Sequence, residues 1–470
     1  MMVVEQLKAI VGAQYVLTGE AAAPYLTDWR KTQTGSALAV VKPADTQQTA
    51  AVVRLCAEHR IPIVPQGGNT GQVAGATPDG SGSAIVLHTG RMNRIREIDP
   101  LNNTMVVEAG CVLQNVQEAA RAADRLFPLS LGAEGSCFIG GNLATNAGGT
   151  QVLSYGNARE LVLGLEVVLP SGEIWDGLRQ LRKDNTGLSL RDLFVGSEGA
   201  LGVITAAVLR LHPLPRAHHT VLLALPDFAA AAEVFQRARD RFHATLTGFE
   251  LISSACLTLV TATFPDLRSP FDTAEDSAER CYALLEIAEH EGADGTAEAV
   301  SDFCAQAWEA GLLEDAAVAA SDTQRGQFWT LRESITLALA KTGYCVKHDI
   351  SLPISAIPEF VAQNSQALAA AFPQARLMMF GHLGDGNLHY NVLLPDDVSA
   401  TWASLETDIQ ACVHDHVVRL GGSISAEQGI GSKRVHDLER YKSPLELRLM
   451  RAIKQAVDPQ GIMNPGKLIP

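Results

Sequence analysis

Two histidines flank a glycine-rich turn in the last quarter of the chain. His382 and His389 are seven positions apart, so in one straight strand they would point to opposite faces. The segment Gly384 to Asn387 between them contains residue types that tolerate the positive φ of a tight turn. The sequence therefore predicts a hairpin that brings both imidazoles to one point.

A carboxylate further along the chain is a candidate third ligand beside these histidines. Glu427 lies in a loop that also contains Gly429 and Gly431. Two imidazoles and one carboxylate leave a bound metal with an open position for substrate. Ordinary polar residues of a hairpin and a loop would have the same spacing, so both interpretations stay open, and spacing alone does not assign Glu427 to the site.

The composition limits the class of protein. A chain of 470 residues with 47% hydrophobic and 19% charged residues is typical of a soluble protein with two or three domains. Its net charge of −15 disfavours nucleic acid and anionic membrane surfaces as partners. No closely spaced pair occurs among the eight cysteines, which argues against iron–sulfur clusters, zinc knuckles and disulfide frameworks.

The sequence shows no targeting or membrane segment. The first residues lack a charged region followed by a long apolar one, and no stretch approaches the roughly 20 apolar residues of a spanning helix. We therefore expect no membrane span and a cytoplasmic location.

The first glycine-rich loop follows a predicted β-α-β unit. Residues 37–43 and 61–65 are typical of strands and residues 49–60 of a helix. The loop at 65–72 then exposes backbone N–H groups, which suits a pyrophosphate. It matches neither a Walker loop nor a Rossmann fingerprint, and a plain turn is the alternative.

A second glycine-rich region spans residues 130–149. It is too rich in glycine for a helix or a strand to be locally preferred. A planar ring system or a diphosphate lying against the backbone would explain it, and close packing between strands is the alternative. The segment 212–215, with prolines at 213 and 215, indicates a domain boundary, after which residues 227–239 and 273–289 are predicted to be amphipathic helices.

Two cations lie on neighbouring predicted elements. Arg332 and Thr336 are one turn apart on a predicted helix, and Lys347 lies on the strand predicted for 345–353. The two cations could frame a ligand that bears carboxylates, although solvated surface charges are common.

Six segments taken in order resemble one family: residues 65–71, 135–149, 196–205, 381–389, 425–431 and 464–467. They resemble the FAD-dependent D-2-hydroxyacid dehydrogenases of the vanillyl-alcohol oxidase fold, most closely the members that act on D-2-hydroxyglutarate, over nearly the whole chain. The resemblance implies an α+β fold with a two-subdomain FAD-binding domain (1–215). It also implies an α+β substrate or cap domain with an antiparallel sheet and the metal hairpin (216–420), and a C-terminal segment that returns to the flavin site (421–470).

The resemblance also implies the roles of individual residues. His382, His389 and Glu427 would hold a divalent metal, zinc, beside the flavin ring. Substrate binding and catalysis would involve Arg332, Thr336, Lys347, Asn391 and the position of Gln428. FAD would contact Pro65, Gln66, Gly67, Gly68, Asn69, Thr70, Gly71, Gln72, Gly132, Gly135, Ser136, Ile139, Gly140, Gly141, Asn142, Thr145, Asn146, Gly148, Gly149, Gly202, Val203, Ile204 and Asn464.

Two positions depart from the family pattern. Relatives with covalent flavin carry a histidine in the first glycine-rich loop, whereas this chain has Asn69, so we expect non-covalent FAD. The family usually has a histidine, a candidate general base, where this chain has Gln428. Because glutamine does not take up a proton at neutral pH, His348 and a metal-bound hydroxide stand as alternative bases.

The expected reaction is oxidation of a D-2-hydroxy acid to the 2-oxo acid by hydride transfer to FAD, assisted by the metal. The two cations favour a dicarboxylate such as D-2-hydroxyglutarate. Its second carboxylate would otherwise enter the site unpaired, and an unpaired buried charge is costly. D-lactate or D-malate dehydrogenase, a metal-dependent hydrolase and a flavin-binding protein without turnover are the alternatives. Relatives of this kind pass electrons to an electron-transfer flavoprotein or a quinone-linked carrier, and a homodimer is an open expectation.

Overall fold

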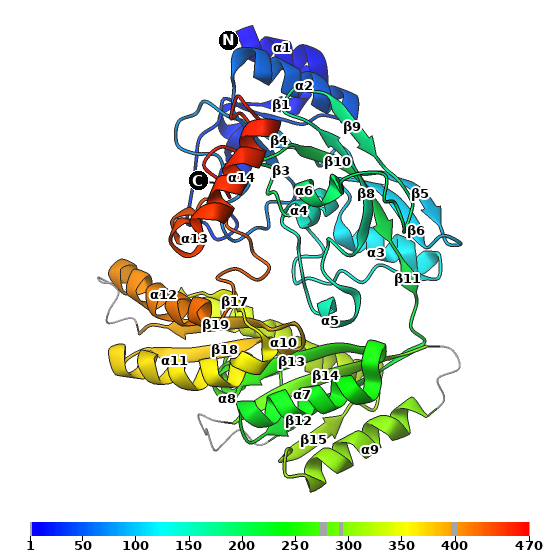
Figure 1. Ribbon diagram of the computed structural model, residues 1–470, viewed down its shortest axis with the longest axis vertical. Coiled ribbons are helices and arrows are strands. Elements are labelled where there is room, and N and C mark those ends of the chain that lie inside the picture. Colours follow the sequence, from blue (N-terminus) through cyan, green and yellow to red (C-terminus); the bar gives the residue numbers. More distant parts are fainter. Residues whose placement is uncertain (1, 272–279, 291–294, 396–401, 470) are drawn as a thin grey trace. The chain divides into compact units, whose positions relative to one another are not determined.

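The computed structural model describes residues 2–271, 280–290, 295–395 and 402–469 (Figure 1). The chain forms two compact units. Unit 1 comprises residues 1–149, 156–214 and 427–470, and unit 2 comprises residues 150–155 and 215–426. Both units combine helices with sheets, and the predicted α+β class is confirmed.

Two short segments lie in a different unit from the one that the sequence boundaries imply. The sequence boundaries assign residues 421–426 to the C-terminal segment, but Ser423 pairs with Ser351 in unit 2, and the Ala426 N–H donates to the Asp349 carbonyl there. They assign residues 150–155 to the first domain, but Leu153 packs against the core of unit 2. Contacts far apart in sequence decide both assignments.

The first sheet of unit 1 contains the predicted β-α-β unit. Parallel strands β2 and β3 pair with the two sides of β4, and helix α2 connects them. The Asp45 side chain caps α2 by accepting a hydrogen bond from the Gln48 backbone N–H at 2.8 Å. The Gln48 side-chain Oε1 in turn accepts from the Ala44 N–H. The strands are β1 (Val16–Leu17), β2 (Ala39–Val41), β3 (Ile63–Gln66) and β4 (Ile85–His88), and the helices are α1 (Met2–Val11) and α2 (Thr46–His59).

The second sheet of unit 1 is antiparallel, in the order β5-β6-β10-β8-β9. Its strands are β5 (Ile95–Asp99), β6 (Thr104–Glu108), β8 (Val162–Val168), β9 (Ile174–Gly177) and β10 (Val203–Arg210). A ribbon of β7 (Arg125–Leu126) and β11 (His212–Pro213) accompanies it. The helices of this part are α3 (Leu113–Ala122), α4 (Ile139–Ala144), α6 (Arg191–Phe194), α13 (Val435–Tyr441) and α14 (Pro444–Val457).

Helix α4 contradicts the expectation that the second glycine-rich region has neither helix nor strand. Gly140 N–H donates to the Ala109 carbonyl at 2.7 Å, and a Cβ on Gly140 would lie 2.7 Å from the Ala109 Cβ. Close packing of this backbone against Ala109 therefore outweighs the low helix propensity of glycine.

Unit 2 is built on one antiparallel sheet, as predicted. The order is β15-β12-β14-β13-β18-β19-β16, and β17 also pairs with β19. The strands are β12 (Ala217–Leu225), β13 (Leu246–Ser253), β14 (Cys281–Glu289), β15 (Asp315–Val318), β16 (Cys345–Val346), β17 (Asp349–Ser351), β18 (Arg376–His382) and β19 (Asn387–Leu393).

Helices cover both faces of this sheet (Figure 1). One apolar core forms with α8 (Ser254–Thr263) and α10 (Asp322–Thr342). The other forms with α7 (Phe228–Phe242), α9 (Thr296–Glu309), α11 (Ile357–Ala371) and α12 (Trp402–Arg419), to which the short helix α5 (Val152–Tyr155) adds Leu153. The helix predicted at 227–239 is confirmed as α7.

The helix predicted at 273–289 is wrong in its second half. Residues 281–289 form β14 between β12 and β13, and residues 272–279 lie outside the described part of the chain. The strand is buried on both faces from Cys281 to Ala288, so it has no alternating pattern. Pairing on both sides overrides the helix propensity of its leucine and alanine residues.

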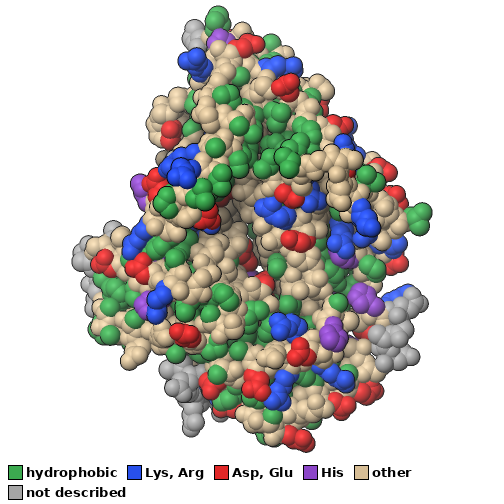
Figure 2. Space-filling view, viewed as in Figure 1, with side chains coloured by type: hydrophobic (Ala, Val, Ile, Leu, Met, Phe, Trp, Pro, Cys, Tyr) green, Lys and Arg blue, Asp and Glu red, His purple; other side chains and the backbone are tan. Residues whose placement is uncertain are grey.

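Charged side chains of both signs are interspersed over the face of the molecule shown in Figure 2. Among the described residues, no helix combines the length and the apolar character that a membrane crossing requires.

The hairpin turn in unit 2 depends on Gly386, and we predict that Gly386→Ala destabilises the protein. Its φ is +82°, and an added Cβ would lie 2.3 Å from the Leu352 carbonyl oxygen. Gly421→Ala is the matched control, because Gly421 has φ +74° and open space around a Cβ. The control should lose about 1–2 kcal/mol from backbone strain alone. Thermal unfolding should show a larger loss for Gly386→Ala, and equal melting temperatures would contradict the prediction.

Candidate active site

The predicted histidine hairpin is present. Strands β18 and β19 pair so that His382 lies opposite Asn387 and Phe380 opposite His389. The turn is a single 3-10 turn at Leu383–Asp385. Because both histidines project from the same face of the hairpin, their ring centroids are 5.5 Å apart.

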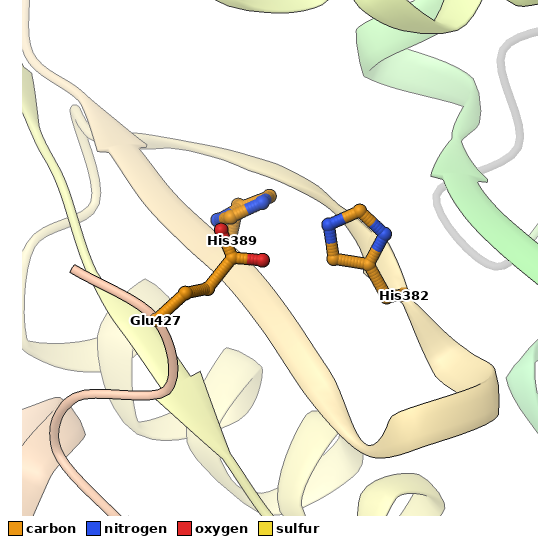
Figure 3. A group of neighbouring side chains, drawn as sticks. All are labelled: His382, His389 and Glu427. Carbon is orange, nitrogen blue, oxygen red and sulfur yellow. The ribbon is translucent and has the colours of Figure 1, made fainter. Parts of the chain in front are cut away.

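Glu427 completes a cluster with these histidines. The potential ligand atoms of His382, His389 and Glu427 lie within 4.8 Å of one another, and Figure 3 shows the two rings and the carboxylate facing a common space. Glu427 directly follows Ala426, whose N–H is bound by Asp349 of β17. Two imidazole nitrogens and one carboxylate oxygen are a donor set that suits a catalytic zinc ion, so these residues fit a divalent metal.

Each histidine of the cluster has a buried carboxylate beside its Nδ1. The Glu250 Oε1 is 2.6 Å from the His382 Nδ1, and the Asp349 Oδ1 is 3.7 Å from the His389 Nδ1. Burial raises the pKa of the Glu250 carboxyl, but His382 and Arg332 outweigh burial and hold that pKa below its ordinary value. Sequence reasoning missed Glu250, because it is 132 residues away from His382 and no local pattern connects them.

The register of β19 places Lys347 and Asn391 on the face that carries the cluster. Val346 pairs with Val392 and Asp349 pairs with His389, and extending this register across residues 347 and 348, which lie between β16 and β17, sets Lys347 opposite Asn391. Residues opposite each other in an antiparallel pair share a face, and so do residues two apart on one strand. Lys347 and Asn391 therefore lie on the face of His389.

Helix α10 brings Arg332 to the same face. The Arg332 Nε donates to the Glu250 Oε2 at 2.9 Å, and the Nη2 lies 2.7 Å from that oxygen. The guanidinium also lies over the Phe380 ring, 4.8 Å from its centroid. Thr336 follows one turn later on α10 and is half-buried. Arg332, a predicted substrate-binding cation, and His382, a predicted metal ligand, thus bind the same carboxylate, that of Glu250.

His348 faces the opposite side of the sheet. It pairs with Tyr390, its Nδ1 lies 2.7 Å from the Tyr390 carbonyl oxygen, and its ring packs edge-on against His414 of α12. Only 1% of His348 is exposed. This orientation argues against His348 as the general base in place of the histidine that the family usually has at the position of Gln428.

Unit 1 contains a cavity that opens to solvent, and its atom-free space, open solvent included, is about 970 Å³. Gln428 lines it, and so do fourteen of the residues predicted to contact FAD: Pro65, Gln66, Gly67, Gly68, Asn69, Thr70, Gly71, Gly140, Gly141, Asn142, Thr145, Gly202, Val203 and Ile204. The other nine are not among the lining residues: Gln72, Gly132, Gly135, Ser136, Ile139, Asn146, Gly148, Gly149 and Asn464. Asn464 supports the cavity lining from outside it, because its Nδ2 donates to the carbonyls of the lining residues Gly75 and Glu198.

The cavity fits a large ligand with polar and planar parts. The two glycine-rich loops touch through their backbones, since a Cβ on Gly68 would lie 2.0 Å from the Ser136 carbonyl oxygen. The Oε1 of Gln66 and the Oδ1 of Asn142 are buried and have no hydrogen-bond partner among the described residues. These two acceptors line the cavity and suit the donor groups of a cofactor such as FAD.

Several lining residues escaped sequence reasoning: Val73, Gly75, Ala76, Thr89, Cys137, Phe138, Ala144, Ser197, Glu198 and Gly199. Glu198 accepts from the N–H groups of Ile430 at 2.8 Å and Gly431 at 2.7 Å. Burial raises the pKa of its carboxyl. Its place among closely spaced glycines, between Gly196 and Gly202, was the available signal for a role in this wall.

Two family models match the chain. The FAD binding domain matches residues 37–177, and the C-terminal domain of FAD linked oxidases matches residues 214–468. The chain is similar to the solved structure of p-cresol methylhydroxylase with substrate bound, at 18% identity and a TM-score of 0.76. The match covers 99% of this chain and 96% of that one. The predicted vanillyl-alcohol oxidase-type fold is confirmed.

Relatives matched over nearly the whole of this chain identify the family. The mitochondrial D-2-hydroxyglutarate dehydrogenase of Bos taurus is 38% identical across 99% of this chain and 82% of its own length. The D-2-hydroxyglutarate dehydrogenase of Xanthomonas citri pv. viticola is 39% identical across 94% of this chain and 92% of its own. The fold and these matches define an FAD-dependent dehydrogenase. The chain belongs to the FAD-dependent D-2-hydroxyacid dehydrogenases, which confirms the resemblance seen in the sequence.

We predict that Glu198→Gln loosens the loop that Glu198 holds. A glutamine offers one acceptor oxygen where the carboxylate offers two, and its amide group would face a backbone N–H. Losing one such bond costs about 1.5–3 kcal/mol, so the amides of Ile430 and Gly431 should exchange hydrogen roughly 10- to 100-fold faster.

Hydrogen exchange followed by mass spectrometry tests this prediction. Glu160→Gln is the control, because Glu160 also accepts from a backbone N–H, that of Asn157, but at the surface. Unchanged exchange at residues 430–431 in Glu198→Gln would show that the two hydrogen bonds do not hold the loop.

Proposed function

We propose that this protein oxidises D-2-hydroxyglutarate to 2-oxoglutarate. Non-covalent FAD would be the hydride acceptor, and a divalent metal, zinc, would activate the substrate hydroxyl. The names of the relatives support the substrate. The cluster of His382, His389 and Glu427 supports the metal.

One observation carries the proposal: the predicted cations lie at the sheet face from which His382 and His389 project. Arg332 is bound to the carboxylate that also binds His382, and Lys347 lies opposite Asn391 on the face of His389. A substrate with a carboxylate at each end finds a separate cation for each of them. Lactate, with one carboxylate, would contact only one of the two cations.

The proposed chemistry divides between the cofactors and the chain. When bound, FAD would supply the acceptor for the hydride from C2 of the substrate. A divalent metal held by His382, His389 and Glu427 would supply Lewis-acid chemistry that lowers the pKa of the substrate hydroxyl. The residues of the chain bind and orient: Arg332 and Lys347 pair with carboxylates, Thr336 and Asn391 offer hydrogen bonds, and the two histidines and Glu427 hold the metal.

Gln428 binds a neighbouring side chain through a hydrogen bond and does not act as a base. Its Oε1 accepts from the Arg434 Nη2 at 3.3 Å, and an amide does not take up a proton at neutral pH. We assign the activation of the hydroxyl to the metal cluster for this reason.

The reduced flavin needs an oxidant. We propose an electron-transfer flavoprotein or a quinone-linked carrier on the basis of the family, and a cytoplasmic location on the basis of the sequence.

The first prediction of this proposal concerns the flavin. Asn69 bonds the Thr27 carbonyl through its Nδ2 and offers no nucleophile for a covalent bond to FAD. The purified protein should therefore be yellow, and acid or heat should release free FAD into the supernatant. Flavin that stays with the precipitated chain would contradict non-covalent binding, and a colourless protein that cannot be reconstituted with FAD would contradict the whole proposal.

The second prediction concerns the metal. His389→Ala should keep the FAD and the fold but lose the metal and most of the turnover. Removing charge stabilisation of several kcal/mol in the transition state should lower kcat by orders of magnitude. Metal analysis and anaerobic flavin bleaching measure the two losses. Normal turnover by chelator-treated wild type, shown by analysis to be free of metal, would contradict the catalytic role.

The third prediction concerns substrate choice. D-2-hydroxyglutarate should be preferred over D-malate, whose shorter chain reaches the second cation poorly, and D-malate over D-lactate. Lys347→Met should remove a charge-assisted hydrogen bond of about 1.5–3 kcal/mol, so kcat/KM for D-2-hydroxyglutarate should fall roughly ten- to a hundredfold. D-lactate should be affected much less.

Lys341→Met is the control for Lys347→Met, because it removes an exposed lysine from α10. Its kinetics should match those of wild type. An equal loss for both substrates in Lys347→Met would show that Lys347 binds the carboxylate that the two substrates share, and would remove the structural case for a dicarboxylate.

A further inference from the structure

One buried carboxylate contacts both a metal-cluster histidine and a proposed substrate-binding cation. Glu250 on β13 has no exposed surface. Its Oε1 lies 2.6 Å from the His382 Nδ1, and its Oε2 accepts from Arg332. Glu250 and His382 are direct partners in the pairing of β13 with β18, so the backbone itself sets this contact.

The contact decides which nitrogen of His382 can bind a metal. An imidazole whose Nδ1–H donates to a carboxylate keeps its Nε2 lone pair for a metal ion, and its ring orientation is fixed. The carboxylate also makes the imidazole a stronger ligand. Glu250 therefore prepares the Nε2 of His382 for metal binding.

The same carboxylate fixes the guanidinium of Arg332. Glu250 binds the edge formed by Nε and Nη2, while the ring of Phe380 covers one face of the guanidinium. Among the described residues, no hydrogen bond to the Arg332 Nη1 accompanies these contacts. That nitrogen is left for a carboxylate of the substrate.

Helix α10 offers a second pair of the same kind for comparison. Glu286 on β14 is 2% exposed and accepts from Arg325 Nε at 2.8 Å and Nη2 at 3.0 Å. It also accepts from Trp329 and Thr220. Arg325 precedes Arg332 by two helical turns, and the pairing of Gly248 with Glu286 puts Glu286 on the same sheet face as Glu250. Both pairs dock α10 on the sheet, but only the carboxylate of Glu250 contacts a ligand of the cluster.

We propose that Glu250 is a positioning residue that orients His382 for the metal and Arg332 for the substrate carboxylate at the same time. This inference rests on the metal-assisted function proposed above. It extends that function, because it makes metal affinity and substrate affinity depend on one side chain that touches neither ligand.

Glu250→Gln tests the proposal with little change in shape. The amide oxygen of the glutamine can still accept from His382, but its NH₂ group then faces the donors of Arg332. In the opposite orientation, Arg332 keeps an acceptor and His382 loses its own. Either way, one of the two partners loses its orientation.

The first measurement is zinc affinity, determined on the full-length FAD-loaded protein by competition with a chromophoric chelator. Loss of such a supporting carboxylate should weaken zinc binding about 10- to 100-fold. The FAD content should stay unchanged. Glu286→Gln should lower the melting temperature but keep the zinc affinity of wild type.

The second measurement separates the roles in turnover at saturating zinc. Glu250→Gln should raise KM for D-2-hydroxyglutarate, because Arg332 is no longer held, whereas Glu286→Gln should leave KM unchanged. If Glu250→Gln fails to fold, Glu250→Asp replaces it. That variant keeps the charge but is one methylene too short to reach both partners, so it should show the same weakened zinc binding.

The outcomes distinguish the inference from the function on which it rests. Wild-type zinc affinity in a folded Glu250→Gln, or an equal loss in Glu286→Gln, would overturn the role of Glu250 alone. A wild-type protein that binds no divalent metal would overturn the metal assistance itself, and the inference with it.

Discussion

The candidate active site depends on the hydrogen-bond register of three neighbouring strands. Strand β18 pairs with β13 on one side and β19 on the other, which sets Glu250 opposite His382 and Phe380 opposite His389. Side chains alternate between the two faces of a strand, so a slip of one residue would send a histidine into the opposite core. His348 shows this alternation, since it is next to Lys347 in the chain and packs against α12 on the other face.

The sequence predicted those parts of the site that local chemistry determines. The hairpin followed from glycine and asparagine between two histidines, and Gly386 does adopt the positive φ that such a turn requires. The two glycine-rich loops were recognised as possible cofactor contacts, and most of the cavity wall comes from them. In each case, a few adjacent residues carry the information.

Contacts between distant segments could not be predicted in this way. Glu427 could be assigned only through family resemblance, because it lies 38 positions after His389 and no spacing rule connects them. Glu250 was missed altogether, since it lies in a strand whose sequence shows no sign of the histidine opposite. The error in β14 has a related cause: a strand buried on both faces lacks the alternation by which strands are recognised, and its partners supply the stability that its own residues do not indicate.

The two missed glutamates meet the same physical requirement in different units. A carboxylate in a dry interior must bind several donors, because an unpaired buried charge costs far more than one hydrogen bond contributes. Glu198 binds two backbone N–H groups and thereby holds a loop, although burial still raises the pKa of its carboxyl, whereas Glu250 binds an imidazole and a guanidinium and thereby orients two side chains. The donors cannot turn away without leaving the charge unpaired. Burial therefore makes each carboxylate a rigid support for the groups that bind it.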